Sequence, residues 1–126
     1  MDGDGDPDIV SASAGIFWLE NQLPSLAWTP HLVVSAASSE YFIGTCTDLN
    51  GDNKADVVAG PSASHGAVSF FANPGWGETT MHPDPLFYYT GPAGDVDNDG
   101  DTDFFYGGNS VSPQSLGRRD NDNTSP

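Results

Sequence analysis

Residues 95–106 read Asp95-Val96-Asp97-Asn98-Asp99-Gly100-Asp101-Thr102-Asp103-Phe104-Phe105-Tyr106. Carboxylates stand at relative positions 1, 3, 5, 7 and 9 of this stretch, glycine stands at position 6, and an apolar run follows at once. Hard cations such as Ca²⁺ take about 6–8 oxygen ligands, which alternating carboxylates on a tight loop supply. Glycine at position 6 permits the bend that brings position 9 back to the ion. The stretch therefore predicts a cation loop that opens a β-strand.

Two similar acidic windows precede this one at a regular interval. Aligned on their last aspartates (Asp8, Asp56 and Asp103), the windows recur after 48 and then 47 residues, and they hold 12 of the 18 acidic side chains. A period of about 20–50 residues is the mark of a repeat architecture. Three windows in register, each leading into an apolar stretch, make a solvated acidic linker the less favoured interpretation.

The two earlier windows are weaker versions of the third. In residues 48–56, Asn50 keeps an oxygen at position 3, and Asn53 replaces the glycine of position 6, which asparagine tolerates because it visits the left-handed region. This window carries less negative charge and is predicted to bind a cation more weakly. In the first window, position 1 falls before Met1, so that site is incomplete. An EF-hand is excluded, because position 12 is not Glu and strands follow instead of helices.

Short segments rich in β-branched and aromatic residues separate the windows. They are bounded by Gly, Pro, Asn or Ser, and none shows a sustained helical period with caps. The pattern predicts an all-β fold with four strands per repeat. The expected strands lie at 8–12, 15–21, 28–34, 41–47, 56–60, 66–74, 76–82, 86–90 and 103–107. The polar end, residues 109–126, is predicted to be a disordered tail.

Composition limits the remaining classes. The 126 residues allow one ordinary domain, and no apolar run approaches the roughly 18 residues that a membrane span needs. The formal net charge is −15 and only three basic residues are present, so nucleic acid is a poor partner. The single cysteine, Cys46, excludes an internal disulfide framework and a multi-Cys zinc site. No signal peptide is visible at the start of the sequence.

These features together resemble FG-GAP/VCBS repeats, the calcium-loop blades of integrin α-chain-type β-propellers. The resemblance covers about residues 1–108 and rests on the nine-residue loop followed by Ile-Val or Val-Val, on Phe17-Trp18-Leu19-Glu20-Asn21, and on the Trp28-x-x-His31 spacing. It implies one four-stranded blade per repeat and Ca²⁺ held in the loop between a blade's first two strands. It also implies an extracellular setting, secreted or at the cell surface. The repeats would span about 1–47, 48–94 and, in part, 95–108.

The resemblance further implies up to three calcium sites, the first of them incomplete. Their ligands would be the acidic and amide side chains of the windows and the backbone carbonyl at position 7. The implied ligands are Asp95, Asp97, Asp99, Asp101 (carbonyl) and Asp103 in the third window, Asp48, Asn50, Asp52, Lys54 (carbonyl) and Asp56 in the second, and Asp2, Asp4, Asp6 (carbonyl) and Asp8 in the first.

Counted in strands, the chain holds about two and a half blades of a partial β-propeller. Closed propellers use roughly 4–8 blades, and open sheets expose pairing edges. We therefore expect a fragment of a longer propeller whose remaining blades are its partners; self-association into a full ring is the alternative. The expected function is a non-enzymatic, calcium-binding module for extracellular binding, adhesion or scaffolding, with a protein or carbohydrate ligand. A piece of a larger carbohydrate lyase or dehydratase, or an inert repeat array, stays open.

A few other residues could carry chemistry. Cys46 is expected to be a small buried hydrophobe rather than a nucleophile. His31 and His82 recur with the repeat, which favours a structural role on the third strand. Three tryptophans are expected to fill the space between blades rather than form a sugar-stacking platform. They are Trp18, Trp28 and Trp76.

Overall fold

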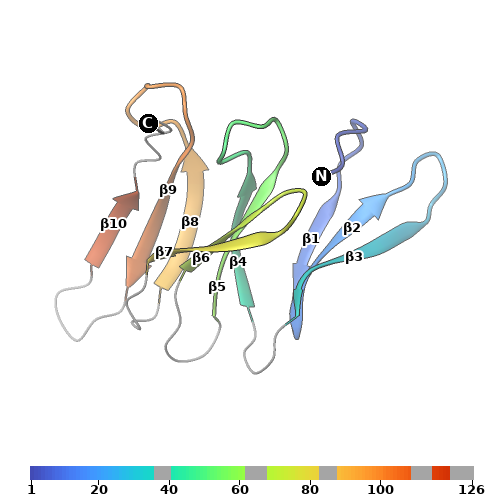
Figure 1. Cartoon of the computed structure of the whole chain (residues 1–126), viewed down its shortest axis with the longest axis horizontal. Helices are drawn as coiled ribbons and strands as arrows, with labels where there is room; N and C mark the ends of the chain where they lie inside the picture. The colour runs from blue at the N-terminus through green and yellow to red at the C-terminus, as the bar shows by residue number, and fades with distance from the viewer. Residues whose placement is uncertain (36–40, 62–67, 83–87, 109–114, 120–126) are drawn as a thin grey trace.

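A computed structural model describes residues 1–35, 41–61, 68–82, 88–108 and 115–119 of the chain. This part is all-β and forms three antiparallel sheets that stand side by side in a row (Figure 1). The strands are β1 (Ile9–Ala12), β2 (Gly15–Asn21), β3 (Trp28–Ser35), β4 (Tyr41–Thr47), β5 (Asp56–Pro61), β6 (Val68–Ala72), β7 (Gly77–His82), β8 (Tyr88–Gly94), β9 (Asp103–Gly108) and β10 (Ser115–Arg119). Within the described ranges, no helix is long and apolar enough to cross a bilayer.

The sheets combine neighbouring strands in sequence order. Sheet 1 has the order β1-β2-β3, sheet 2 the order β4-β5-β6-β7, and sheet 3 the order β10-β9-β8. The predicted all-β class is confirmed, and β2 and β4 have the bounds that the apolar patterns predict. The second acidic window connects β4 to β5, and the third connects β8 to β9. Each of these windows therefore joins two strands that pair with each other.

One strand lies where the sequence predicts a disordered tail. β10 pairs antiparallel with β9, so that Arg118 lies opposite Phe105 and Arg119 opposite Phe104. Pairing satisfies backbone N–H and C=O groups whatever the side chains are, and the polar composition of this segment is therefore a poor guide to its structure. The tail prediction is wrong for 115–119, and the rest of 109–126 lies outside the described residues.

Two apolar clusters fill the spaces between the sheets. Successive residues of a strand point to opposite faces, so Val57 of β5 belongs to the cluster shared with sheet 1, whereas Val58 belongs to the cluster with Phe104 of sheet 3. Both valines are fully buried. The first cluster consists of Ile16, Trp18, Val33, Val57, Ala59 and Phe71, and the second of Leu49, Val58, Val68 and Phe104. Sheet 2 thus packs on both of its faces.

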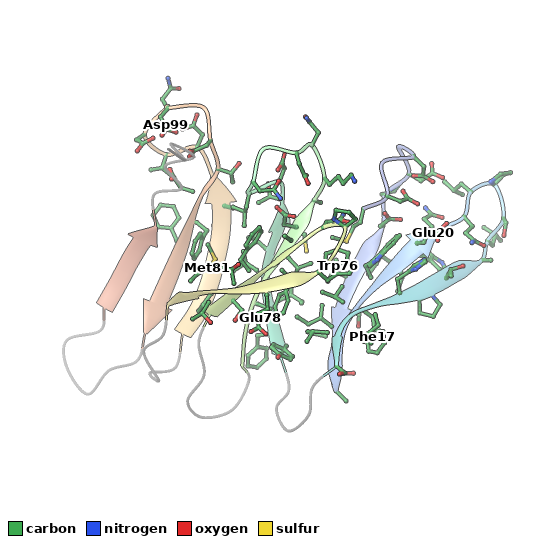
Figure 2. All side chains as sticks on the ribbon, in the orientation of Figure 1. Phe17, Glu20, Trp76, Glu78, Met81 and Asp99 are labelled. Atoms are coloured by element: carbon green, nitrogen blue, oxygen red, sulfur yellow. The ribbon has the colours of Figure 1, made fainter. Side chains whose placement is uncertain are left out.

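The outer face of sheet 1 has no such cover among the described residues. Because Asp8 and Asp56 hold the same repeat position, Ile9 corresponds to Val57. Val57 is 0% exposed, whereas Ile9 is 48% exposed and lies opposite Leu19. Phe17, which shares this face, is only partly buried (Figure 2). An apolar face that is buried in sheet 2 is therefore open in sheet 1.

The tryptophans divide between core and surface. Trp18 belongs to the first apolar cluster, and Trp76 packs against it. Trp28 is 44% exposed at the start of β3, an edge strand of sheet 1, so the expectation of core packing is wrong for this residue. An edge strand lacks a neighbour on one side, which leaves a large side chain at its end in contact with water.

Two further expectations are corrected by strand register and burial. His31 lies opposite Trp18, whereas His82 lies opposite Val68, the counterpart of Ile16, so the two histidines do not hold equivalent positions. The register shifts between Ile16 and Phe17 and between Val68 and Ser69 fall at the same repeat position, so they do not cause this difference. At the 48-residue spacing of Asp8 and Asp56, the counterpart of His31 is Thr79. Cys46 is exposed rather than buried, because β4 is an edge strand of sheet 2.

Candidate metal centre

The third acidic window folds into a loop whose carboxylates bind its own backbone. Asp95 accepts the N–H of Asn98 at 2.6 Å and the N–H of Gly100 at 3.1 Å. Asp99 accepts the N–H of Asp101 at 3.1 Å. One oxygen each of Asp95, Asp97 and Asp99 lies within 4.8 Å of the others, and all three side chains are exposed. Figure 2 shows Asp99 at the outer end of this loop. Three predicted ligands are therefore brought together here.

The second window repeats the same hydrogen bonds at the same relative positions. Asp48 accepts the N–H groups of Gly51 and Asn53, each at 2.8 Å, as Asp95 does in the third window. The side-chain oxygen of Asn50 accepts the N–H of Asp52 at 3.0 Å. Asp52 in turn accepts the N–H of Lys54 at 2.9 Å. Asn50 thus offers an oxygen at position 3, as predicted, but it supplies no charge.

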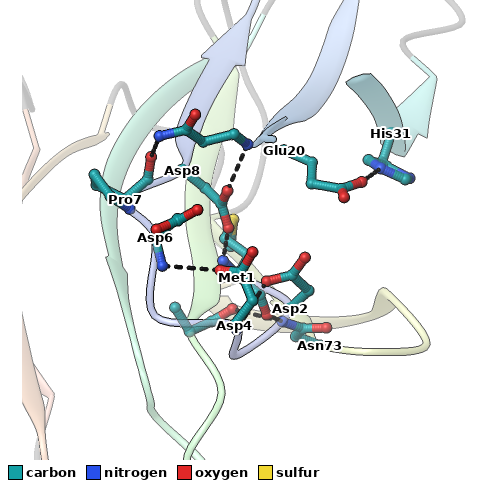
Figure 3. Close-up of polar contacts among 11 residues, drawn as sticks. Met1, Asp2, Asp4, Asp6, Pro7, Asp8, Glu20, His31 and Asn73 are labelled. Carbon is teal, nitrogen blue, oxygen red and sulfur yellow. Dashed lines mark hydrogen bonds and ion pairs between the residues drawn. The ribbon is translucent and has the colours of Figure 1, made fainter. Parts of the chain in front are cut away.

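The first window follows this pattern over the part that the chain contains. Asp2 accepts the N–H of Asp4 at 3.2 Å, and Asp4 accepts the N–H of Asp6 at 2.8 Å (Figure 3). In the second window too, the side chain at position 3 accepts the N–H of position 5, and the side chain at position 5 accepts the N–H of position 7. The sequence periodicity therefore corresponds to a repeated local structure.

Positions 4 and 6 of every window adopt positive φ. Only glycine and, among larger residues, asparagine or aspartate enter this region readily. The values are 88° and 95° for Gly3 and Gly5, 79° and 64° for Gly51 and Asn53, and 66° and 97° for Asn98 and Gly100. The interpretation of Asn53 as a substitute for glycine is confirmed. The positive φ at position 4 is not among the predictions from the sequence, although each window has Gly or Asn there.

The aspartates at position 9 are structural anchors at the base of the loops. Asp56 is 0% and Asp103 is 1% exposed. The carboxylate of Asp56 accepts the N–H of Leu49, at position 2, at 2.9 Å, and that of Asp103 accepts the N–H of Val96 at 3.0 Å. In the first window the amino group of Met1 takes this place and forms an ion pair with Asp8. Each loop is closed in this way by its last carboxylate.

An asparagine completes each anchor: Asn21 is the last residue of β2, and Asn73 directly follows β6. Asp56 accepts the backbone N–H of Asn73 at 2.9 Å, and the Asn73 side chain donates to the carbonyl of Ala55 at 3.1 Å. Asp8 and Asn21 repeat this arrangement: the N–H bond measures 2.9 Å and the amide donates to the carbonyl of Pro7 at 3.3 Å (Figure 3). This role is not among the predictions from the sequence; its signal is an Asn at the end of β2 and directly after β6, the equivalent strands of two repeats.

The charge in the loops is only partly compensated by protein groups. Burial raises the pKa of Asp56, while the N–H groups of Leu49 and Asn73 lower it and the nearby charges of Asp52 and Asp48 raise it. A carboxylate oxygen that accepts one N–H keeps a second lone pair, so Asp56, whose two oxygens each accept one N–H, retains capacity toward an ion. The side-chain atoms that the three windows offer as metal ligands are all oxygens, which suit a hard divalent cation and not a soft metal.

The fourteen predicted ligands are placed unequally. Asp95, Asp97 and Asp99 converge, whereas Asp56 and Asp103 lie buried beneath their loops and Asp8 is partly buried. Lys54 carries its predicted role on a backbone carbonyl, so its side chain is not part of that role. When the chain was compared with protein-family models, with curated proteins and with solved structures, nothing matched.

Proposed function

We propose that this chain is a calcium-binding segment of a β-propeller-type repeat protein that resembles the FG-GAP/VCBS kind. The observation that carries the proposal is the local geometry that three acidic windows share: positive φ at positions 4 and 6, and a side chain at position 5 that accepts the N–H of position 7. Oxygen ligands on such a loop are the ones that Ca²⁺ takes. The ligands would be those of the three windows, and the third window has the densest carboxylates.

The net charge supports a role for the cation in stability. Three dications would reduce the net charge from −15 to −9 and would relieve repulsion within each loop. The second and third loops each join two paired strands, so an ion there would hold a hairpin together. Extracellular calcium modules work with Kd values of about 10⁻⁴–10⁻³ M, which agrees with largely exposed loops.

The arrangement of the sheets supports the propeller part of the proposal. Sheet 2 is packed on both faces, and the equivalent outer face of sheet 1 is apolar and uncovered within the described residues. A further sheet of the same kind would cover it. We assign the segment to binding or scaffolding outside the cell rather than to catalysis, because backbone N–H groups of their own loops engage the carboxylates that could form an acid–base pair.

The direct test is a calcium titration of protein stripped with EDTA. We expect binding in isothermal titration calorimetry and a higher melting temperature with CaCl2, reversed by EGTA. MgCl2 serves as the control for general charge screening, because Mg²⁺ demands tighter octahedral geometry and should stabilise less. A melting curve that CaCl2 leaves unchanged would contradict the proposal.

A further inference from the structure

A cavity of about 580 Å³ lies between sheet 1 and the turn that joins β6 to β7. Trp18 and His31 of sheet 1 form one wall, Trp76 of the turn forms another, and Asp2 and Lys54 add charged groups from two acidic windows. Cavities of roughly 300–1,000 Å³ with aromatic walls and a few polar groups are typical of small-molecule sites. None of the calcium ligand roles described above uses the side chains of Trp18, His31, Trp76 or Lys54.

The wall on sheet 1 is rigidly built. Trp18 and His31 lie opposite each other on β2 and β3, and their rings stack with centroids 4.2 Å apart and an interplanar angle of 12°. Nε2 of His31 lies 2.7 Å from a carboxylate oxygen of Glu20 (Figure 3). The imidazole is therefore held from two directions. Rings fixed in this way lose little conformational entropy when a ligand binds.

The opposite wall carries a tryptophan on strained backbone. Trp76 has φ of 54°, a region in which a bulky side chain is a rare outlier. Its backbone N–H donates to the carbonyl of Ala72 at 2.6 Å. It sits between Gly75 and Gly77, at the turn that faces sheet 1 (Figure 2). Strain of this kind persists only where the surroundings hold it, and it concentrates at ligand sites.

The wall that Trp18 and His31 form on sheet 1 has no equivalent at the matching positions of sheet 2. By repeat position, Phe70 corresponds to Trp18, and it pairs with Thr79 rather than with a histidine. The counterpart of Glu20 is Ala72. The Asp–Asn anchors recur in both repeats, but the wall does not, so stacking of one sheet on the next does not require it.

The charges around the cavity restrict the ligand. Lys54 disfavours a cation, and the net charge of −15 together with Asp2 disfavours an anion. An uncharged ligand satisfies both limits. If it has an apolar face and several hydroxyl groups, the face packs on an indole and the hydroxyls bind the polar groups of the cavity. We propose that this cavity binds a neutral sugar ring stacked on Trp76. The proposal rests on the aromatic walls and on Lys54, and it does not require an ion in the first window, of which Asp2 is an implied ligand.

The test uses the full chain in calcium-containing buffer. The probes are methyl glycosides of glucose, galactose, mannose and N-acetylglucosamine, with choline as the cationic and glucuronate as the anionic comparison. Saturation-transfer NMR and tryptophan fluorescence report binding. We expect at least one neutral glycoside to bind, and Trp76→Gly, which also relieves the positive φ, to weaken it roughly two- to tenfold. Trp28→Ala, a tryptophan outside the cavity, should leave the affinity unchanged.

A second variant guards against loss of folding in the first. Lys54→Met changes only a loop side chain, and we expect it to weaken the same glycoside roughly two- to tenfold, as loss of one polar contact should. Circular dichroism and the melting temperature show that each variant is folded. The proposal is overturned if no glycoside binds, if only choline or glucuronate binds, or if Trp28→Ala weakens binding as much as Trp76→Gly.

Discussion

Asp56 and Asn73 are joined by a buried hydrogen bond at the base of the second loop. The carboxylate accepts the Asn73 backbone N–H at 2.9 Å, while the Asn73 side chain donates to the carbonyl of Ala55, the residue before the aspartate, at 3.1 Å. The same amide donates to the carbonyl of Met1 at 2.8 Å. Asn73 therefore closes its own repeat and also ties it to the loop of the preceding one.

The first prediction concerns this asparagine anchor. Asn73→Ala should lower the free energy of unfolding by about 1–3 kcal/mol, because two carbonyls lose their donor near the core. Asn21→Ala removes one longer bond and should cost about 0.5–1.5 kcal/mol. Urea unfolding measures both values, with the exposed neighbour Gln22→Ala as the control. Equal losses in the two asparagine variants would contradict the bridging role of Asn73.

The sequence predicts the strands well because their signal is local. The bounds of β2 and β4 follow from apolar runs between turn residues. Asn53 and its positive φ follow from backbone sterics. Strand β10, by contrast, depends on a partner edge that no local pattern reports. The exposure of Cys46 and Trp28 depends on which strands lie at sheet edges, and this too is set by tertiary structure.

The sequence predicts the acidic loops of the candidate site but not the Asp–Asn hydrogen bonds at their base. The spacing of Asp95, Asp97 and Asp99 predicts the convergence that their side chains show. The partnership of Asp8 with Asn21 spans 13 residues, and that of Asp56 with Asn73 spans 17. Contacts across such separations become visible only when the strands are paired.

The second prediction ranks calcium ligands. Asp97→Ala removes a charged oxygen from the three-carboxylate cluster, whereas Asn50→Ala removes a neutral one from the second loop. Ionised ligands interact about twice as strongly as neutral ones, so the loss of affinity should be about tenfold larger for Asp97→Ala. Asp103→Ala should also exceed Asn50→Ala, because it removes a buried carboxylate that closes its loop. Calorimetric titration with CaCl2 measures the ranking, and equal losses would remove the ligand assignment.

The third prediction concerns pH in protein freed of metal by EDTA. Burial raises the pKa of Asp56 above 3.8, so the folded state binds this proton more tightly than the unfolded chain does. The stability contributed by this group is fully present below pH 3.8 and is lost as the pH rises through the raised pKa. Asp56→Asn should therefore reduce the fall in stability between pH 3.8 and the raised pKa of Asp56, even if the variant is less stable at every pH. Asp97→Asn, which removes an exposed charge, is the control, and an equal flattening there would point to net charge instead.

The last prediction compares two residues at one repeat position. Val57→Ala removes two methyl groups from a fully buried site between sheets 1 and 2 and should cost about 2–3 kcal/mol. Ile9→Ala alters the open face of sheet 1, where the side chain is 48% exposed, and should cost about 1 kcal/mol or less. Urea unfolding at low protein concentration measures both, and dilution controls for association through the open face. If Ile9→Ala costs as much as Val57→Ala at every concentration, then this face is covered within the chain itself, and the need for a further sheet disappears.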